Sequence, residues 1–336
     1  MTEDIVPDTE HRGLIARLPQ PARDLAQLAR FDRPIGWWLL FWPCVVGVWL
    51  SGAGWQWGTI CWFLLGSIAM RGAGCVYNDI TDSELDKKVA RTASRPIASG
   101  RGSKQTAWIW LGVLCLVGLI VLLQLPLLAQ VIALASLLLV AAYPFMKRIT
   151  WWPQAWLGLT FNWGVLVGWA AFGDAGWAAP IAVYLGCVLW TVGYDTIYAL
   201  QDREDDALVG IRSSALRMGG KVKQGVAICY GGAMLLWALG FWLLRADWVS
   251  WLTLMPVGWH LAWQVLTLDE NDPDNPLHRF RSNRMAGLLL ASVWSWMIII
   301  SFALKIGGAK RRARKFEQDF WASENYEETL DAYRNQ

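Results

Sequence analysis

Residues 105–146 read QTAWIWLGVLCLVGLIVLLQLPLLAQVIALASLLLVAAYPFM, a stretch without a single Asp, Glu, Lys or Arg. A helix needs about 20 predominantly apolar residues to cross the hydrocarbon core of a bilayer. This stretch is twice that long, and Leu125-Pro126-Leu127 in its middle divides it into two spans. A water-soluble helix needs a polar face, and here almost no polar residue is available to form one. The stretch therefore predicts a pair of membrane-spanning helices.

The rest of the chain repeats this pattern. Hydrophobic residues make up 55% of the 336 residues and charged residues only 17%, whereas an average soluble domain carries about 25% charge. Five further charge-free stretches fit one crossing each, and the stretch 34–70 divides at Ser51-Gly52-Ala53-Gly54 into two. The sequence therefore predicts an all-α integral membrane protein rather than a soluble helical one. Nine spans are expected: 36–51, 56–77, 105–124, 127–145, 154–172, 177–198, 224–244, 248–267 and 285–305.

The composition also excludes several classes of function. The chain has 3 histidines, which weakens any zinc-enzyme interpretation because zinc sites rely on His and Cys. Its 6 cysteines lie in apolar stretches without a CxxC pair, so we expect reduced, packed thiols. The net charge of +3 is small and scattered, so no nucleic acid partner is expected.

The distribution of Lys and Arg predicts the orientation in the membrane. Basic residues are concentrated in the N-terminal segment and in the loops after the second, fourth, sixth and eighth spans, whereas the opposite loops contain only Arg245. The positive-inside rule places the basic loops in the cytoplasm. We therefore expect a cytoplasmic segment 1–33, a transmembrane domain 34–306 and a charged tail 307–336. The basic group within 310–315 breaks the rule: either the ninth span does not cross, or a late basic tail is tolerated.

The N-terminal segment bears on the cellular location. It mixes acidic with basic residues and has no apolar core, so it is not a secretory signal. The acidic residues also argue against an intact mitochondrial transit peptide. We expect a bacterial inner membrane, with the mitochondrial inner membrane as the alternative.

Two acidic clusters follow the second and sixth spans. Residues 78–86 read NDITDSELD and residues 195–206 read DTIYALQDREDD. Side chains three and four residues apart share one face of a helix, and carboxylates spaced in this way repel one another. The two predicted faces consist of Asp79, Asp82 and Asp86, and of Asp195, Tyr198, Asp202 and Asp206. A positive partner is expected between them, and oxygen ligands without His or Cys favour Mg2+ or Mn2+. Because Mg2+ binds one or two carboxylates together with substrate phosphates, two opposed acidic faces predict a diphosphate site.

The spacing of the clusters indicates an internal repeat. Asp202 and Asp206 lie 120 residues after Asp82 and Asp86. Each cluster follows the second span of a four-span unit, formed by spans 1–4 and 5–8. Repeats of this kind often place the binding site at their interface. The alternative for either cluster alone is a polar loop end.

Several cations lie in the same predicted membrane layer. Basic residues follow both clusters and can bind phosphate oxygens, although the positive-inside rule explains many of them equally well. Arg71 lies within the second span, where a charge is a functional hypothesis by default, with snorkelling to the interface as the alternative. The residues singled out are Arg33, Arg71, Lys87, Lys88, Arg91, Arg95, Lys147, Arg148, Arg212, Arg217 and Lys221.

These residues together resemble the UbiA superfamily of intramembrane prenyltransferases and, within it, the enzymes that act on 4-hydroxybenzoate in ubiquinone biosynthesis. The resemblance runs from about Arg30 to Leu304. One departure is Trp151, where many members have a His. The matching segments are 33–36 (RPIG) with Trp42-Pro43, 71–75 (RGAGC), 78–86, 91–96 (RTASRP), 143–148 (YPFMKR) and 194–206.

The resemblance implies a nine-helix fold around a central cavity that opens sideways to lipid. It implies transfer of a polyprenyl group from polyprenyl diphosphate to the ring of 4-hydroxybenzoate, ortho to the hydroxyl, with Mg2+ as cofactor. The residues implied to act through Mg2+ are Asp79, Asp82, Asp86, Asp202 and Asp206, with Asn78, Asp195, Tyr198 and Asp205 in support. The implied diphosphate contacts are Lys88, Arg91 and Arg212, and the candidates for the aromatic carboxylate are Arg33, Arg71 and Arg148.

Among these arginines we favour Arg148, because it ends the fourth span with no acidic residue nearby in the sequence. Arg71 shares a helix face with Asp79 and could pair with it instead. Two other functions stay open: prenyl transfer to another aromatic or to a quinone or haem precursor, and secondary transport. A transporter would place its acidic residues near the membrane midplane, whereas here they lie at span ends. The sequence does not determine the prenyl chain length or the oligomeric state.

Overall fold

In the computed structural model, the described residues are 15, 17–87, 92–173, 176–246 and 248–322. Their secondary structure is helical, without a strand, which confirms the predicted all-α class. The main helices are α2 (Gln20–Leu28), α3 (Ile35–Leu50), α4 (Trp57–Thr81), α5 (Ser83–Asp86), α6 (Lys104–Leu122), α7 (Leu127–Ile149), α8 (Pro153–Phe161), α9 (Gly164–Phe172), α10 (Ala178–Tyr198), α11 (Arg203–Val209), α12 (Ser214–Met218), α13 (Val222–Leu244), α14 (Val249–Leu252), α15 (Met255–Leu266) and α16 (Asn275–Ala322). Two 3-10 turns, η1 (Ala199–Asp202) and η2 (Gly219–Lys221), join α10 to α11 and α12 to α13.

Within the described residues, 6 helical segments are long and apolar enough to cross a membrane. The predicted count of nine is therefore not confirmed. α3 has 16 residues and is shorter than the others, and the predicted span 248–267 is divided into α14 and α15, the latter starting with Pro256 in its first turn. The span predicted at 285–305 lies inside α16, a helix of 48 residues. The six segments are Trp57–Thr81, Lys104–Leu122, Leu127–Ile149, Pro153–Phe172, Ala178–Asp202 and Ser214–Leu244.

The span predicted at 154–172 is interrupted between α8 and α9 by Asn162. The buried Asn162 amide nitrogen donates to the carbonyl oxygens of Gly158 at 2.8 Å and Cys187 at 3.1 Å, and to the Thr191 hydroxyl at 2.7 Å. An Asn side chain competes with the helical backbone for such bonds. This interruption gives the bundle a buried polar connection between α8 and α10.

The two halves of the chain meet where α3 packs against α9. Gly47 on α3 faces Gly168 on α9, and Gly164 on α9 faces Cys44 on α3. Small residues at such positions let membrane helices approach closely. A Cβ atom at Gly47 would lie 2.2 Å from the Val165 carbonyl oxygen, and one at Gly168 would lie 2.3 Å from the Cys44 carbonyl oxygen. The contact is therefore between backbones, with no space for a side chain.

We expect Gly168→Leu to destabilise the protein strongly. Overpacking typically costs about 1–3 kcal/mol, and here the obstacle is a backbone carbonyl, which a side-chain rotation cannot relieve. Thermal unfolding of the purified protein in detergent measures the effect. Gly112→Leu on α6 is the matched control, because a Cβ atom there meets nothing within 4 Å. Equal unfolding temperatures for the two variants would show that the α3–α9 contact is not tightly packed.

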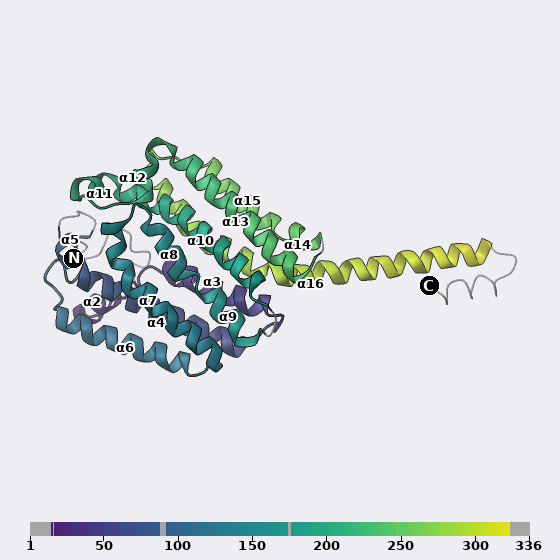
Figure 1. Ribbon diagram of the computed structural model, residues 1–336, viewed down its shortest axis with the longest axis horizontal. Helices are drawn as coiled ribbons and strands as arrows, with labels where there is room; N and C mark the ends of the chain where they lie inside the picture. Colours follow the sequence, from purple (N-terminus) through teal and green to yellow (C-terminus); the bar gives the residue numbers. More distant parts are fainter. Residues whose placement is uncertain (1–14, 16, 88–91, 174–175, 247, 323–336) are drawn as a thin grey trace.

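The second and third spans of each predicted four-span unit are in contact. α4 packs against α6, and α10 packs against α13, while the repeat itself stays a prediction. Figure 1 shows α5 and α11, which contain parts of the acidic clusters, at the same end of the bundle. α16 begins near that end, since Arg203 of α11 pairs with Glu270 at 3.4 Å just before it.

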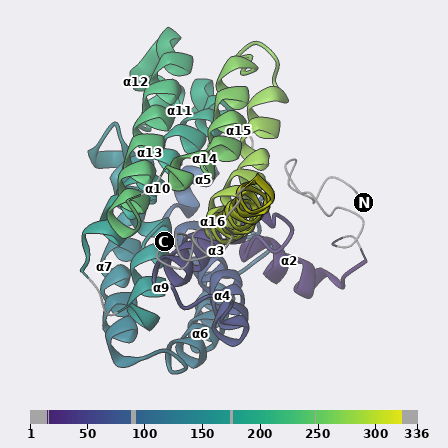
Figure 2. The same cartoon turned by 90° about the vertical axis from the view of Figure 1, so that its right-hand side faces the viewer.

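The basic group at 310–315 is part of α16. The helix of 48 residues continues without interruption past residue 306, and at 1.5 Å per residue its length is about 72 Å, more than twice the hydrocarbon core of a bilayer. Its C-terminal part projects from the end of the bundle opposite the acidic clusters (Figure 1), and in Figure 2 this projecting end faces the viewer with the bundle behind it. Both alternatives for the basic group stay predictions from the sequence.

Candidate active site

The helices enclose a cavity of about 610 Å3, as predicted. It is lined by side chains from α3, α4, α6, α7, α8 and α10, and both acidic clusters contribute to its polar end. The predicted site residues that line it are Arg33, Arg71, Asn78, Asp79, Asp82, Asp195, Tyr198, Asp202, Asp206 and Arg212. Segments more than 100 positions apart in the sequence therefore meet in one chamber.

One part of the cavity wall is apolar. Leu119 on α6 and Leu134 and Leu137 on α7 line it, and their exposed fractions are 47%, 50% and 43%. The sideways opening to lipid that the family resemblance implies stays a prediction.

The predicted continuous helical face of each acidic cluster is wrong, because both helices are interrupted. α4 ends at Thr81, and Asp82 (φ −97°, ψ 8°) leads into α5. In the second cluster, Asp202 (φ −105°, ψ 5°) is the last residue of the 3-10 turn after α10 and leads into α11. The same bend therefore occurs at the two aspartates that the predicted repeat makes equivalent. The bends set the aspartates apart from the regular faces of α4 and α10.

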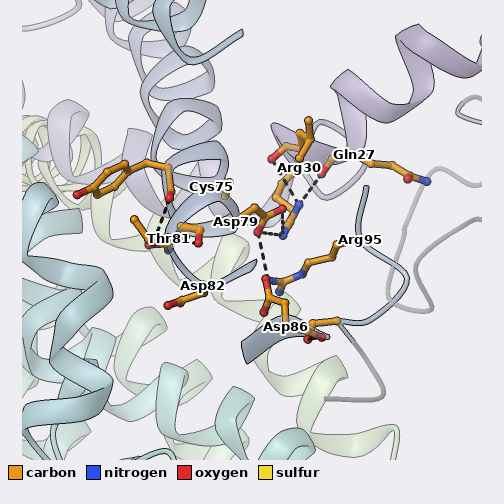
Figure 3. Close-up of polar contacts among 12 residues, drawn as sticks. Gln27, Arg30, Cys75, Asp79, Thr81, Asp82, Asp86 and Arg95 are labelled. Atoms are coloured by element: carbon orange, nitrogen blue, oxygen red, sulfur yellow. Dashed lines mark hydrogen bonds and ion pairs between the residues drawn. The ribbon is translucent and has the colours of Figure 1, made fainter. Parts of the chain in front are cut away.

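Asp79 is held by arginines on two sides. The Arg30 guanidinium donates to both Asp79 carboxylate oxygens, at 2.8 and 3.0 Å, and Arg95 donates to one of them at 3.2 Å. Arg30 also donates to the Gln27 carbonyl oxygen at 2.6 Å. Its backbone φ of 57° lies in the left-handed region, which residues other than glycine adopt rarely. Figure 3 shows this group, which joins the N-terminal segment to the first cluster.

Asp86 is the second carboxylate that Arg95 holds, at 2.8 Å. Asp86 is buried and does not line the cavity. Burial raises the pKa of Asp86, Arg95 opposes this rise and the nearby charge of Asp79 adds to it. The Thr92 hydroxyl fixes the local backbone by donating to the Asp86 carbonyl oxygen at 2.8 Å.

Asp82 points away from this group, as Figure 3 shows, and pairs with cations from α7. Lys147 lies 3.1 Å and Arg148 3.2 Å from its carboxylate oxygens. No acidic residue lies near Arg148 in the sequence, but α7 brings it to an aspartate 66 residues earlier in the chain. Its side chain is 52% exposed, and it is absent from the cavity wall.

Arg71 occupies the interior of the cavity and does not pair with Asp79. Its guanidinium contacts the Cys75 thiol and lies 5.4 Å from the centre of the Phe161 ring. Gly36 makes room for it, since a Cβ atom there would lie 2.5 Å from the Arg71 Nε. Among the described residues no carboxylate pairs with Arg71, and its buried Nε has no hydrogen-bond partner. Arg33, by contrast, lies 3.3 Å from Asp32.

The second cluster lies across the cavity. Tyr198 packs on the Phe280 ring with 4.4 Å between ring centres, while Arg212 donates to the Ile149 carbonyl oxygen at 2.7 Å. The Arg212 guanidinium also lies 5.5 Å from the centre of the Trp151 ring. Trp151, the residue that departs from the family pattern, thus lies against Arg212, a predicted diphosphate contact. Lys88, Arg91 and the side chain of Asp205 lie outside the described part of the structure.

The donor set fits Mg2+ in kind. Among the described residues, no three His, Cys, Asp or Glu side chains are grouped closely enough to enclose a metal ion. Mg2+ does not need such a group, because it commonly keeps several waters and binds one or two carboxylates plus substrate phosphates. Asn78, Asp82, Asp202 and Asp206 supply oxygen atoms around one chamber, and the cations beside the first cluster balance its charge in this structure.

Three cations that the predicted site did not include prove central to its geometry. Arg95 and Lys147 were singled out among the cations of this layer but were not assigned a contact, although both lie in the segments that carry the family resemblance, 91–96 and 143–148. Arg30 lies at the margin of the matching region, and no pattern in the sequence sets it apart from the other arginines of the N-terminal segment. Its role depends on a contact with a residue 49 positions later.

A helical membrane bundle with two aspartate motifs facing one cavity defines an intramembrane enzyme class, and the comparisons agree. The UbiA prenyltransferase family matches residues 40–292, and the chain belongs to this family. The chain is similar to 4-hydroxybenzoate polyprenyltransferase, mitochondrial, of Bos taurus (43% identical, 83% of this chain and 76% of that one) and of Homo sapiens (42%, 83% and 76%). The enzyme of the same name from Aedes aegypti is 44% identical, and the match covers 79% of this chain and 61% of that protein.

Solved structures share the fold at lower sequence identity. A UbiA homologue from Aeropyrum pernix K1 has a TM-score of 0.63 at 21% identity, covering 79% of this chain and 98% of that one. A UbiA homologue from Archaeoglobus fulgidus bound to GPP and Mg2+ has a TM-score of 0.60 at 16% identity, covering 82% and 99%.

Proposed function

We propose that this protein transfers a polyprenyl group from polyprenyl diphosphate to the ring of 4-hydroxybenzoate, ortho to the hydroxyl, in ubiquinone biosynthesis. The observation that carries the proposal is a cavity with residues of both aspartate motifs at its polar end and apolar side chains along the rest of its wall. A polyprenyl diphosphate has the matching chemistry, an anionic head on a long apolar chain. The names of the similar curated enzymes support the acceptor.

The polar end suits the diphosphate. Asn78, Asp82, Asp202 and Asp206 would hold Mg2+, with Asp86, Asp195 and Asp205 in support, and Mg2+ would neutralise the leaving diphosphate. Lys147 and Arg95 line the same end and can bind phosphate oxygens, as Arg212 can. For Lys88 and Arg91 this role rests on the family resemblance. Asp79 is turned toward Arg30, so we propose that it positions Arg95 rather than binding metal.

The apolar walls suit the reacting carbon. Ionisation of the donor C–O bond leaves an allylic cation, and a chamber that excludes water protects it from hydrolysis. Aromatic rings stabilise such a cation, and Tyr143, Phe161 and Trp163 line this region. The acceptor ring then forms the new C–C bond and loses one proton, while diphosphate departs.

The acceptor needs a cation separate from the diphosphate site, and the structure favours Arg71 over Arg148. Arg71 is inside the cavity and carries no carboxylate partner among the described residues, whereas Arg148 pairs with Asp82 outside the cavity wall. Arginine suits a benzoate because its planar fork binds a carboxylate bidentately.

We expect Arg71→Ala to raise the acceptor KM at least ~10-fold and to leave the donor KM nearly unchanged. A hydrogen bond to a charged group contributes about 1.5–3 kcal/mol, and about 1.4 kcal/mol corresponds to a factor of ten. Steady-state kinetics with each substrate varied in turn measure both constants, and Arg148→Ala is the comparison. If Arg148→Ala raised the acceptor KM and Arg71→Ala left it normal, Arg148 on α7, and not Arg71, would bind the acceptor carboxylate.

The location of the protein is proposed with the function. The polyprenyl chain and the apolar helices require a bilayer. The similar curated enzymes are named mitochondrial, which fits the mitochondrial alternative, while a bacterial inner membrane with the motifs on the cytoplasmic side stays a prediction from the sequence.

A panel of acceptors tests the proposed function. Membranes containing the protein are incubated with a polyprenyl diphosphate and, separately, with 4-hydroxybenzoate, another quinone-precursor aromatic or haem. We expect prenylated product with 4-hydroxybenzoate alone. A product formed from another acceptor, with none from 4-hydroxybenzoate, would establish the alternative prenyl transfer reaction.

A further inference from the structure

The first acidic cluster is neutralised by protein cations in two distinct ways. Asp79 and Arg30 form a buried pair, with side chains 2% and 8% exposed and both carboxylate oxygens engaged. Asp82, in contrast, is held from the cavity side by Lys147, whose side chain is 32% exposed. Arg95 bridges Asp79 and Asp86 at 3.2 and 2.8 Å. The Asp79–Arg30 pair is therefore buried, whereas Lys147 and Arg95 face the chamber.

The cations that face the chamber have a second possible partner. Lys147 and Arg95 line the same cavity as Asp82, Asp202 and Asp206, where the proposed function places the donor diphosphate. A metal ion that approaches Asp82 meets the like charge of Lys147, 3.1 Å from the carboxylate. A diphosphate offers Lys147 new acceptor oxygens, and charge-assisted bonds to phosphate are among the stronger hydrogen bonds. The Lys147–Asp82 ion pair therefore opposes the binding of either ligand alone. When one ligand binds and breaks this pair, the other ligand binds more easily.

We propose that Lys147 and Arg95 exchange partners during the binding of substrate. In the donor-free enzyme they neutralise Asp82 and Asp86; when the donor binds, they move to its diphosphate oxygens, and Asp82, which lines the cavity, is released to Mg2+. Arg30 stays paired with Asp79. Because Asp79 also accepts from Arg95, this pair keeps Arg95 close both to Asp86 and to the diphosphate. This inference rests on the proposed function, and it adds that metal and diphosphate bind cooperatively because of the protein, beyond their attraction in solution.

The exchange has a consequence that a fixed diphosphate ligand would not have. Coupling between two ligands is reciprocal, and typical couplings change affinity 5–150-fold. Removal of the Lys147 charge should therefore tighten metal binding when diphosphate is absent, although the same change weakens diphosphate binding. A lysine that only binds diphosphate would leave the metal affinity unchanged.

The test measures Mn2+ binding to the purified full chain in detergent by electron paramagnetic resonance, without diphosphate and with inorganic pyrophosphate. We expect Lys147→Gln to lower the Kd of Mn2+ about 10-fold without pyrophosphate and to reduce the coupling between the two ligands. Formation of the Mn2+–pyrophosphate complex in solution is the same for both proteins and cancels in the comparison. Lys87→Gln is the matched control, since Lys87 pairs with the exposed Glu84 at 2.8 Å and is absent from the cavity wall.

A second measurement uses the opposite partner and does not depend on metal. Asp82→Asn should tighten pyrophosphate binding without metal about 10-fold, because it frees Lys147. In a chain that already carries Lys147→Gln this gain should disappear, which separates release of the lysine from the general loss of a negative charge. Thermal unfolding confirms that each variant is folded, and Arg95→Gln replaces Lys147→Gln if the latter does not fold.

The outcomes separate the exchange from the proposed function. Unchanged or weaker Mn2+ binding in Lys147→Gln, or an equal gain from Asp82→Asn in both backgrounds, would overturn the exchange while transfer activity persisted. A wild-type protein that binds no Mn2+ under either condition and transfers no prenyl group would overturn the proposed function together with the exchange.

Discussion

Asp82→Asn and Asp202→Asn are each expected to reduce the rate of prenyl transfer by at least about 100-fold. Removal of one charge-stabilising element of a transition state typically has an effect of this size. The two aspartates occupy the same kind of bend, at φ −97° and −105°, on opposite sides of one cavity. We therefore expect similar losses from two substitutions 120 residues apart.

Initial rates at saturating substrate, with the amount of folded protein checked by thermal unfolding, provide the measurement. Glu84→Gln is the matched control, because Glu84 lies in the first acidic cluster, pairs with exposed Lys87 and is absent from the cavity wall. A near-normal rate in either aspartate variant would mean that its cluster is only a polar loop end.

Removal of divalent cations is expected to abolish transfer, and addition of Mg2+ to restore it. The diphosphate enters a chamber that already contains the carboxylates of Asp82, Asp202 and Asp206. The cations described around the first cluster pair with its own carboxylates, so additional positive charge is needed to stabilise the leaving group. Activity is measured after dialysis against a chelator and again after titration with Mg2+. Full turnover in excess chelator would rule out the paired-aspartate account.

The sequence predicted the fold class and the location of the site because both depend on local patterns. A long charge-free stretch avoids water only as a buried or lipid-facing helix. The predicted spans at 105–124 and 127–145 therefore correspond closely to α6 and α7. The internal interruptions could not be predicted in the same way. The break at Asn162 depends on acceptors at Cys187 and Thr191, which the fold brings together from another helix.

The candidate site shows the same division. The aspartates and Arg71 were found because acidic clusters and a charge within a span stand out against an apolar background. The pairing of Arg148 with Asp82 could not be predicted, because distance along the sequence does not determine distance in a bundle. Arg30 was missed for the same reason: its importance comes from Asp79, which only the packing of the N-terminal segment against α4 brings within 2.8 Å.

We propose that this chain forms a carbon–carbon bond between a polyprenyl group and the ring of 4-hydroxybenzoate. The structure of the product, determined by mass spectrometry and nuclear magnetic resonance after incubation with both substrates, tests this reaction directly. We expect one new bond at the ring carbon ortho to the hydroxyl, with the carboxylate and hydroxyl unmodified. An ether or ester linkage, or unchanged 4-hydroxybenzoate in the presence of folded protein, Mg2+ and donor, would contradict it.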